Sequence, residues 1–229
     1  ALAKVTNAYE QKMVMSREVI ADKGIWTAKK RYILNVHDSE GVRYSEPKLK
    51  IMGIEAVKSS TPKVCRNKIK EALKIIMNED SKVLNTFIQD FRSDFMKLTP
   101  EEIAYPRSVN GLEKFSSSNG MFAKGAPIHC KGAILYNHLL KTKKLTKKYP
   151  LIQEGDKIRF VHLRQPNVYT SSAFSFITSF PKELDLKDKI DYDTQFTKSF
   201  VEPLKFISEK IDWWIDDSYG TQGTLDGFF

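Results

Sequence analysis

The apolar residues change their spacing at Ser59-Ser60-Thr61-Pro62. Downstream of this stretch they recur every three or four residues, as on one face of a helix. We expect Thr61 to be the N-cap and Pro62 the first helical residue, because a hydroxyl accepts from free N–H groups and proline tolerates that position. The buried face of this helix would consist of Cys65, Ile69, Ala72, Leu73 and Ile76.

Further helices are predicted along the rest of the chain. One follows Asp80-Ser81, others cover 131–140 and both sides of Glu202-Pro203, and a strand is expected at 158–163. The buried apolar stripe of the helix after Asp80 would contain Leu84, Phe87, Ile88, Phe91, Phe95 and Leu98. Residues 105–128 are rich in Gly, Ser, Asn and Pro, which predicts a long loop.

The sequence before residue 59 is typical of β-strands. β-Branched and aromatic residues predict strands at 12–20 and 31–36. Turn residues at Asp38-Ser39-Glu40-Gly41 predict a hairpin that returns through 42–44. We expect a turn at Gly24 and, after it, the cations Lys29, Lys30 and Arg31 on strand positions.

The two halves of this pattern define the expected fold class, α+β. We expect an antiparallel sheet in residues 1–57, a mainly helical domain in residues 58–221 and a C-terminal peptide tail in residues 222–229.

Composition indicates a globular protein. Of the 229 residues, 41% are hydrophobic, which is enough for a core. No apolar run approaches the roughly 20 residues of a membrane span, and the start lacks a signal peptide, so no membrane partner is expected. The two cysteines, Cys65 and Cys130, form neither a disulfide framework nor a zinc motif. Because the chain begins at Ala1 without Met, we expect a piece of a longer protein.

The net charge of +9 is unevenly distributed. Residues 1–150 contain 28 Lys and Arg against 15 Asp and Glu, whereas residues 151–229 contain 9 against 13. The balance is therefore +13 in the first part and −4 in the second. This asymmetry favours a polyanionic partner for the first part, although a solvated lysine-rich surface is the alternative.

The chain ends with a Q-x-x-L-x-x-F-F pattern that resembles a sliding-clamp-binding peptide. In one 3₁₀ turn, Leu225, Phe228 and Phe229 would form an apolar plug, with Gln222 as a polar anchor. The alternative is a tail whose apolar residues fold back onto the domain.

Five strings resemble, in order, the C-terminal palm and thumb of a T-even-type phage replicative DNA polymerase of family B. They are Gly24–Tyr32, Glu46–Glu55, Lys58–Lys63, Ile128–Asn137 and Glu154–Ile158. The resemblance implies that residues 1–57 are the C-terminal part of the palm and residues 58–221 the thumb.

The resemblance also implies which residues bind DNA. Lys30 and Tyr32 would test the last base pairs from the minor groove, where every correct pair presents acceptors. Lys29 and Arg31 would accompany them or balance nearby carboxylates. The phosphate-gripping set would be Lys50, Lys58, Ser59, Ser60, Thr61, Lys63, Arg66, Lys70, Lys74, His129 and Lys131.

Two of these interpretations have alternatives. His129 is also compatible with a satisfied core histidine. The lysine-rich run at 141–148 would either extend the phosphate track or form a solvated loop.

The catalytic aspartates of the family are absent from this sequence. Glu18 matches a family carboxylate near the metals and is a possible accessory group, or it pairs with Arg17 or Lys23. We therefore expect Mg²⁺ and nucleotide binding in the complete enzyme, no metal bound by this chain alone, and no activity of this chain alone.

The sequence as a whole predicts part of a viral DNA-directed DNA polymerase, either a fragment or a split subunit. It would grip primer-template DNA and tether the enzyme to the sliding clamp during replication. Its partners would be this DNA, the clamp and the N-terminal remainder of the polymerase, in the cytoplasm of the infected bacterial host. The alternative is a noncatalytic, clamp-recruited DNA-binding factor. A nuclease using Glu18 and Asp22 is a third hypothesis.

Overall fold

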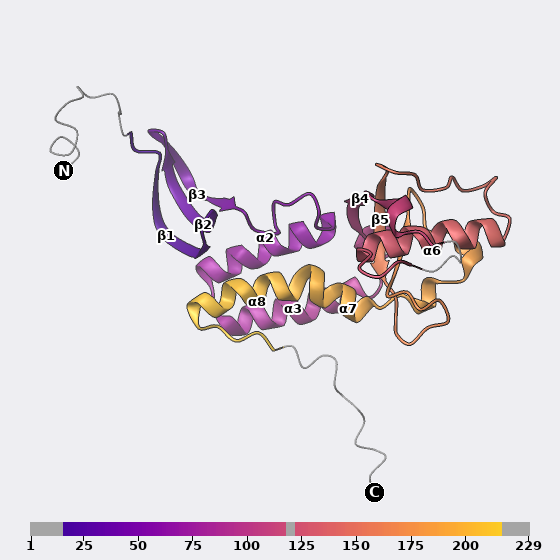
Figure 1. Ribbon diagram of the computed structural model, residues 1–229. Helices are drawn as coiled ribbons and strands as arrows, with labels where there is room; N and C mark the ends of the chain where they lie inside the picture. Colours follow the sequence, from indigo (N-terminus) through magenta and orange to yellow (C-terminus); the bar gives the residue numbers. More distant parts are fainter. Residues whose placement is uncertain (1–15, 118–121, 217–229) are drawn as a thin grey trace, which may run out of the picture. The chain divides into compact units, whose positions relative to one another are not determined.

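The computed structural model describes residues 16–117 and 122–216 (Figure 1). It separates into two compact units, Ala1–Met52 and Gly53–Phe229. The expected clamp-binding peptide lies outside the described residues, and so do residues 12–15 of the first predicted strand.

The first unit is a three-stranded antiparallel sheet. Its strands are β1 (Val19–Ala28), β2 (Arg31–Ser39) and β3 (Val42–Met52), in the order β1-β2-β3. The predicted hairpin is confirmed: Ser39 pairs with Val42, and Glu40 and Gly41 have φ of 52° and 86°. Positive φ at both central residues matches the turn to the twist of the strands.

Three local predictions for this unit were wrong. The first strand was predicted at 12–20, but residues 16–18 are not in a strand and β1 runs from Val19 to Ala28. Gly24 is not in a turn but inside β1, where a Cβ would lie 2.6 Å from the Trp26 ring and 2.8 Å from Leu34. A larger residue there would require the Trp26 or Leu34 side chain to move. Lys29 and Lys30 are not on a strand but form the turn between β1 and β2, with Lys30 at φ 61°.

The second unit contains a helical layer and a second sheet. Its helices are α2 (Lys63–Asn78), α3 (Ser81–Phe95), α4 (Pro100–Ile103), α5 (Leu112–Phe115), α6 (Ile128–Thr142), α7 (Tyr192–Phe196) and α8 (Glu202–Ser208). Its strands are β4 (Tyr105–Ser108), β5 (Lys157–His162) and β6 (Ala173–Phe176), antiparallel in the order β4-β5-β6. A π-helical segment, η3 (Thr197–Val201), joins α7 to α8, and 3₁₀ turns cover Lys182–Leu184, Lys187–Lys189 and Glu209–Ile211.

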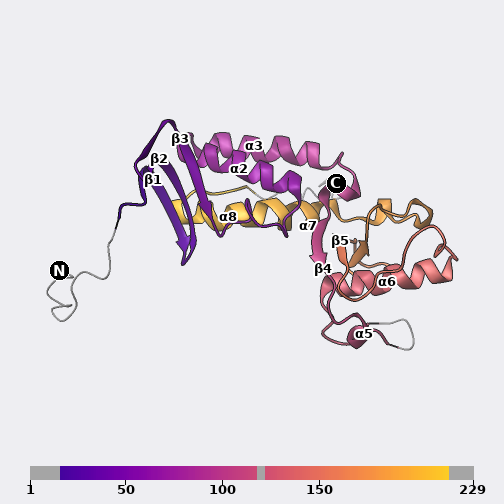
Figure 2. The ribbon, with the colours of Figure 1, turned by 90° about the horizontal axis from the view of Figure 1, so that it is seen from above.

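Figures 1 and 2 show α2, α3 and α8 side by side. Phenylalanines from α3 and the last helical run fill the space between them. The Phe91 ring lies 4.7 Å from that of Phe200 and 5.7 Å from that of Phe196, and Phe95 lies 5.2 Å from Phe196. Of the apolar stripe predicted for α3, Leu84, Ile88, Phe91 and Phe95 are buried, whereas Phe87 is half-buried and Leu98 follows the end of the helix. Asp80 caps this helix by accepting from the N–H groups of Lys82 and Val83.

The second sheet packs against α6 at a glycine. A Cβ on Gly132 would lie 2.5 Å from Ser175 Oγ and 2.8 Å from its backbone nitrogen. This close approach brings α6 onto β6, and Ser175 Oγ donates to the carbonyl of His129 at 2.9 Å.

A buried amide links the helical layer to the second sheet. The fully buried Gln195 donates through Nε2 to the carbonyl of Ile103 at 2.7 Å and accepts from the backbone N–H of His162 at 3.0 Å. Within the same helical run, Ser199 Oγ donates to the backbone carbonyl of Gln195. The two bonds of the Gln195 side chain hold α7 against α4 and β5.

Three predictions for the second unit need correction. The first helix begins at Lys63 rather than Pro62, because Pro62 has an extended ψ of 142° and serves as its N-cap in place of Thr61. Residues 105–128 contain β4 and α5 in addition to loop, and Pro106 fits β4 because this strand is at the sheet edge.

The third correction concerns the helices around Glu202-Pro203. They form one continuous run with α7, because the π-helical segment precedes the proline. The backbone N–H of Glu202 donates to Thr197, five residues back. A widened turn of this kind absorbs the disruption that proline causes inside a helix.

The α+β prediction itself is confirmed. The strands at 31–36 and 158–163 and the helices after Pro62, after Asp80 and at 131–140 are all present, and the strand at 31–36 and the helix at 131–140 are longer than predicted. The strand β6 was not predicted.

Gly132→Ala should lower the free energy of unfolding. Alanine in place of glycine favours a helix by about 0.5–1 kcal/mol, but overpacking costs about 1–3 kcal/mol, so the clash with β6 should dominate. His138→Ala, on the exposed side of α6, controls for helix propensity alone. Chemical denaturation of the full chain measures both, and a Gly132→Ala variant as stable as His138→Ala would contradict the packing described above.

Candidate nucleic-acid interface

The basic face of α2 is exposed, as the sequence predicted. Lys63, Lys70 and Lys74 are exposed and Arg66 is half-buried, while the apolar face of the helix is buried. The helix therefore presents four cations to solvent along one side.

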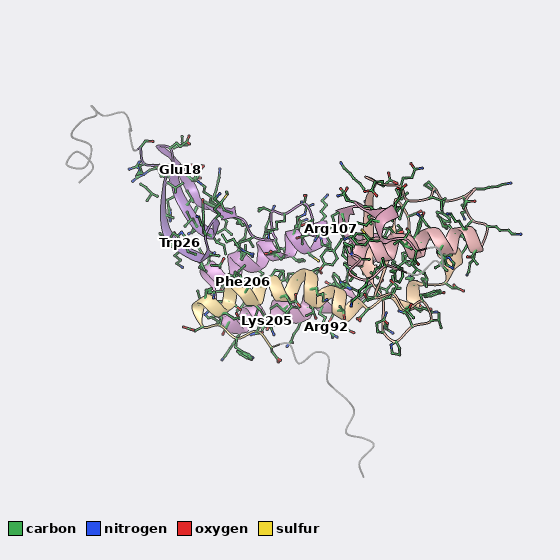
Figure 3. The ribbon with its side chains drawn as sticks, in the orientation of Figure 1. Glu18, Trp26, Arg92, Arg107, Lys205 and Phe206 are labelled. Atoms are coloured by element: carbon green, nitrogen blue, oxygen red, sulfur yellow. The ribbon has the colours of Figure 1, made fainter. Side chains whose placement is uncertain are left out.

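A hollow of about 390 Å³ lies where the segment before α2 meets β4 and the π-helical turn. It is lined by Lys58, Ser60 and Thr61, which the sequence had predicted, and by Arg107 and Lys198, which it had not. Figure 3 labels Arg107, which belongs to β4.

Tertiary structure brings these unpredicted cations to the hollow. Arg107 is placed by the pairing of β4 with β5, where it lies opposite Ile158. Lys198 is placed by the π-helical segment. The position of Lys198 could have been suspected from Pro203, because a proline in a helical pattern implies a distorted turn just before it.

A second hollow of about 520 Å³ lies at the N-terminus of α2. Its cations are Lys63, Arg66 and Arg159, of which Arg159 was not predicted, and Thr61 borders both hollows. The buried Nε of Arg66 forms no hydrogen bond within residues 16–117 and 122–216.

Two carboxylates also line the second hollow, but each is held by N–H groups nearby. Glu102 accepts from Thr99 N and Oγ1 at 2.9 and 2.8 Å, and these bonds lower the pKa of its carboxyl. Glu101 accepts from the N–H of Phe180 at 2.8 Å. The three cations therefore outnumber the two carboxylates, whose oxygens already accept hydrogen bonds from the protein.

The N-terminus of α2 adds further donors to this hollow. Its N-cap, Pro62, provides no side-chain hydrogen bond to the first turn. The first N–H groups of a helix have no partner within the helix and together carry a partial positive charge, so they favour anions.

The histidines near the first hollow are held neutral. Burial, together with the charge of Lys198, lowers the pKa of His162 to about 4. Burial and Arg107 also lower the pKa of His129. Positive charge in this hollow at neutral pH therefore comes from lysine and arginine, with Lys58 paired to Glu55 at 2.7 Å.

The remaining predicted positions in the second unit lie at the start of α6 and before α2. His129 and Lys131 are half-buried, and the His129 ring lies 6.3 Å from that of Phe160, a residue that lines the first hollow. Ser59 is exposed in the turn before α2.

The first unit carries the other predicted cations. Lys29 and Lys30 are exposed at the β1–β2 turn, whereas Arg31 and Tyr32 are half-buried in β2. Lys50 forms an ion pair with Glu18, which lowers the pKa of that carboxyl. Lys50 is therefore the partner that the structure gives to Glu18.

Within residues 16–52, Glu18 and Asp22 are both engaged by other side chains. The described residues contain no group of three His, Cys, Asp or Glu side chains that could hold a metal ion. Asp22 accepts from Asn35 at 2.8 Å and lies 3.1 Å from His37 Nε2, and Glu18 is occupied by Lys50. These donors do not fit Mg²⁺, which needs several free oxygen ligands.

The segment that leads to the tail is attached to α3. Asn85 Nδ2 donates to the carbonyl of Trp214 and its Oδ1 accepts from the N–H of Asp216, both at 3.0 Å. Ile215, between them, is buried. The four predicted clamp-binding residues, Gln222, Leu225, Phe228 and Phe229, lie outside the described residues.

The part of the chain that the structure describes has no helix long and apolar enough to cross a membrane. No protein-family profile matches the chain.

Two curated proteins are similar to it over nearly its whole length. The DNA-directed DNA polymerase of Enterobacteria phage T4 is 31% identical over 240 residues, which cover 100% of this chain and 26% of the relative. The DNA-directed DNA polymerase of Escherichia phage RB69 is 35% identical over 227 residues, covering 93% of this chain and 25% of the relative. The chain spans about a quarter of the length of these relatives. It therefore corresponds to one region of the T-even-type phage DNA-directed DNA polymerases.

Proposed function

We propose that this chain is the part of a viral DNA-directed DNA polymerase that grips the primer-template duplex and tethers the enzyme to its sliding clamp. Residues 1–57 would complete the palm, residues 58–221 would form the thumb and residues 222–229 would bind the clamp. The observation that carries the proposal is the pair of cationic hollows at the start of α2, in a chain similar to phage DNA polymerases.

The hollows suit the sugar-phosphate backbone of a duplex. Phosphates require cations and N–H donors but no recognition of bases, and both kinds of group line the hollows. A replicative polymerase needs this kind of contact because it must move along every sequence. Arg107, Lys198 and Arg159 join the predicted phosphate-binding residues in this proposal.

The first unit would contact the primer terminus. Lys30 lies at the tip of the β1–β2 turn, where a long side chain reaches furthest from the sheet, and Tyr32 follows on β2. Contacts of this kind in the minor groove test pairing geometry, because the acceptors there are present in every correct pair.

Nucleotidyl transfer itself would take place on the remainder of the polymerase. In the complete enzyme, Mg²⁺ would stabilise the attacking and leaving oxygens, and its ligands would come from outside this chain. The residues described above would hold the duplex, and the tail would raise the local concentration of clamp. The complete enzyme would act in the cytoplasm of the infected bacterial host.

Charge removal in the first hollow should weaken duplex binding. For Arg107→Gln with Lys198→Gln in the full chain, we expect roughly tenfold weaker binding or more. The slope of log affinity against log salt should become shallower by roughly two, since each lost phosphate contact removes about 0.9. Fluorescence anisotropy with a recessed duplex measures both.

Lys82→Gln with Lys97→Gln is the matched control for that experiment, because both lysines are exposed on or next to α3, away from the hollows. Equal losses in the two double variants would mean that net charge, and not the hollow, binds the duplex.

Mixing the chain with the N-terminal remainder of a T-even-type polymerase should restore primer extension. A chain that ends at Thr221 should restore basal extension but not stimulation by the clamp, because the tail would supply contacts with the clamp and none with DNA. Extension assays with and without clamp measure this. No extension from the mixture, with clamp-dependent DNA binding retained, would favour the noncatalytic alternative, and lone metal-dependent cleavage would favour a nuclease.

Lys30→Asn in the reconstituted enzyme should weaken engagement of the primer terminus. Asparagine tolerates the left-handed backbone of this turn, so the change removes the cation while it preserves the hairpin. We expect extension to become more sensitive to salt, as measured by the rate of single-nucleotide addition over a salt series. Unchanged rates at raised salt would exclude a role for Lys30 at the primer terminus.

A further inference from the structure

The segment Lys141–Lys148, called here the lysine loop, is a strongly basic feature that the hollows do not include. It contains five lysines in eight residues and begins in the last turn of α6. All five lysines are exposed.

The lysine loop has a defined backbone. Lys144 adopts a left-handed φ of 55°, and the N–H of Leu145 donates to the carbonyl of Leu140 at 2.8 Å, which ends α6. The next turn is closed by the N–H groups of Lys148 and Tyr149, which donate to Leu145 at 2.9 and 3.0 Å. The loop therefore presents its side chains from fixed positions.

Glu183 holds one side of the loop. It forms an ion pair with Lys148 and accepts from the Tyr149 hydroxyl at 2.8 Å, and its backbone carbonyl lies 3.4 Å from Lys143 Nζ. Lys141, Lys144 and Lys147, in contrast, form no ion pair within residues 16–117 and 122–216. Three cations are thus available to an external anion.

The exposed side of α6 connects the loop with the hollows. Lys131, His138 and Lys141 lie on its solvent-facing side, and no Asp or Glu occurs between Pro127 and Gln153. The surface between the start of α6 and the loop is therefore basic or neutral along this helix, with no carboxylate on it to repel a phosphate chain.

The length of α6 is short enough for one straight duplex to span it. Its 15 residues span about 22 Å at 1.5 Å per residue. A duplex rises about 3.4 Å per base pair along its axis, so this distance corresponds to roughly six or seven base pairs. A duplex bound at the start of α6 could reach the loop without bending.

We infer that the lysine loop is a second contact for the phosphate backbone of the same duplex, roughly six base pairs away from the hollows. The inference rests on the proposed duplex grip and adds a separate surface to it. Stabilisation of the C-terminus of α6 explains only the lysines of its last turn, because the helix dipole acts over a single turn and Lys147 lies beyond it.

The test uses the full chain and DNA hairpins with stems of about 4 base pairs, too short to reach the lysine loop from the hollows, and about 20 base pairs. Lys141→Gln, Lys144→Gln and Lys147→Gln are combined in one variant. On the long stem, the salt slope should become shallower by roughly two to three, at about 0.9 per lost contact, while binding of the short stem should be unchanged. The control combines Lys82→Gln, Lys97→Gln and Lys210→Gln, which remove the same charge from exposed positions on other elements.

Each outcome separates the two proposals. A wild-type chain without salt-sensitive binding to either stem would overturn the duplex grip itself. If the affinity of the wild type depends steeply on salt and the loop variant has the same slope, only the second contact would be overturned. Equal effects of the loop and control variants would also overturn it, as would a loop variant that loses clamp binding but keeps full affinity for the long stem. Thermal unfolding of both variants should match the wild type, since all six side chains are exposed.

Discussion

The geometry of the second unit depends on one buried amide, that of Gln195. Its side chain satisfies the carbonyl of Ile103 and the N–H of His162, two backbone groups on elements far apart in sequence. Leaving a buried backbone group without a partner costs about 1–3 kcal/mol, so the helical run and the second sheet are held in one relative position. Lys198, one turn further along the run, and Arg107, on the strand next to β5, consequently line the same hollow.

The irregular turn after Gln195 is part of the same arrangement. Proline at position 203 cannot donate to the helix, and the π-helical segment before it widens the backbone by one residue. That extra residue rotates Lys198 and Ser199 relative to a regular helix, and both line the first hollow. Because π-helical turns occur frequently at functional sites, the position of this one beside the first hollow agrees with a binding role.

The electrostatics of the interface differ between the two units. In the second unit, the carboxylates that line the hollows are held by N–H groups or by Lys58, and the nearby histidines are neutral, so the arginines and remaining lysines set the local charge. In the first unit, by contrast, Lys50 is paired with Glu18, while Lys29 and Lys30 at the turn are exposed. A polymerase that slides along DNA would benefit from many such moderate contacts, since each can be exchanged for an equivalent one at the next base pair.

The sequence alone determined the α+β class, the positions of most helices and strands, and the exposed cations of α2, because each follows from local periodicity and capping. The backbone at Gly24, Lys30 and Pro62 was predicted incorrectly, since packing of Trp26 and the geometry of tight turns override residue preferences. Only the tertiary structure brought Arg107, Arg159 and Lys198 to the residues before and within α2. The spacing of apolar residues in a sequence indicates which face of a helix or strand is buried. A hollow, in contrast, forms where several elements meet, and their contacts depend on strand pairing and on buried hydrogen bonds between residues some 90 positions apart.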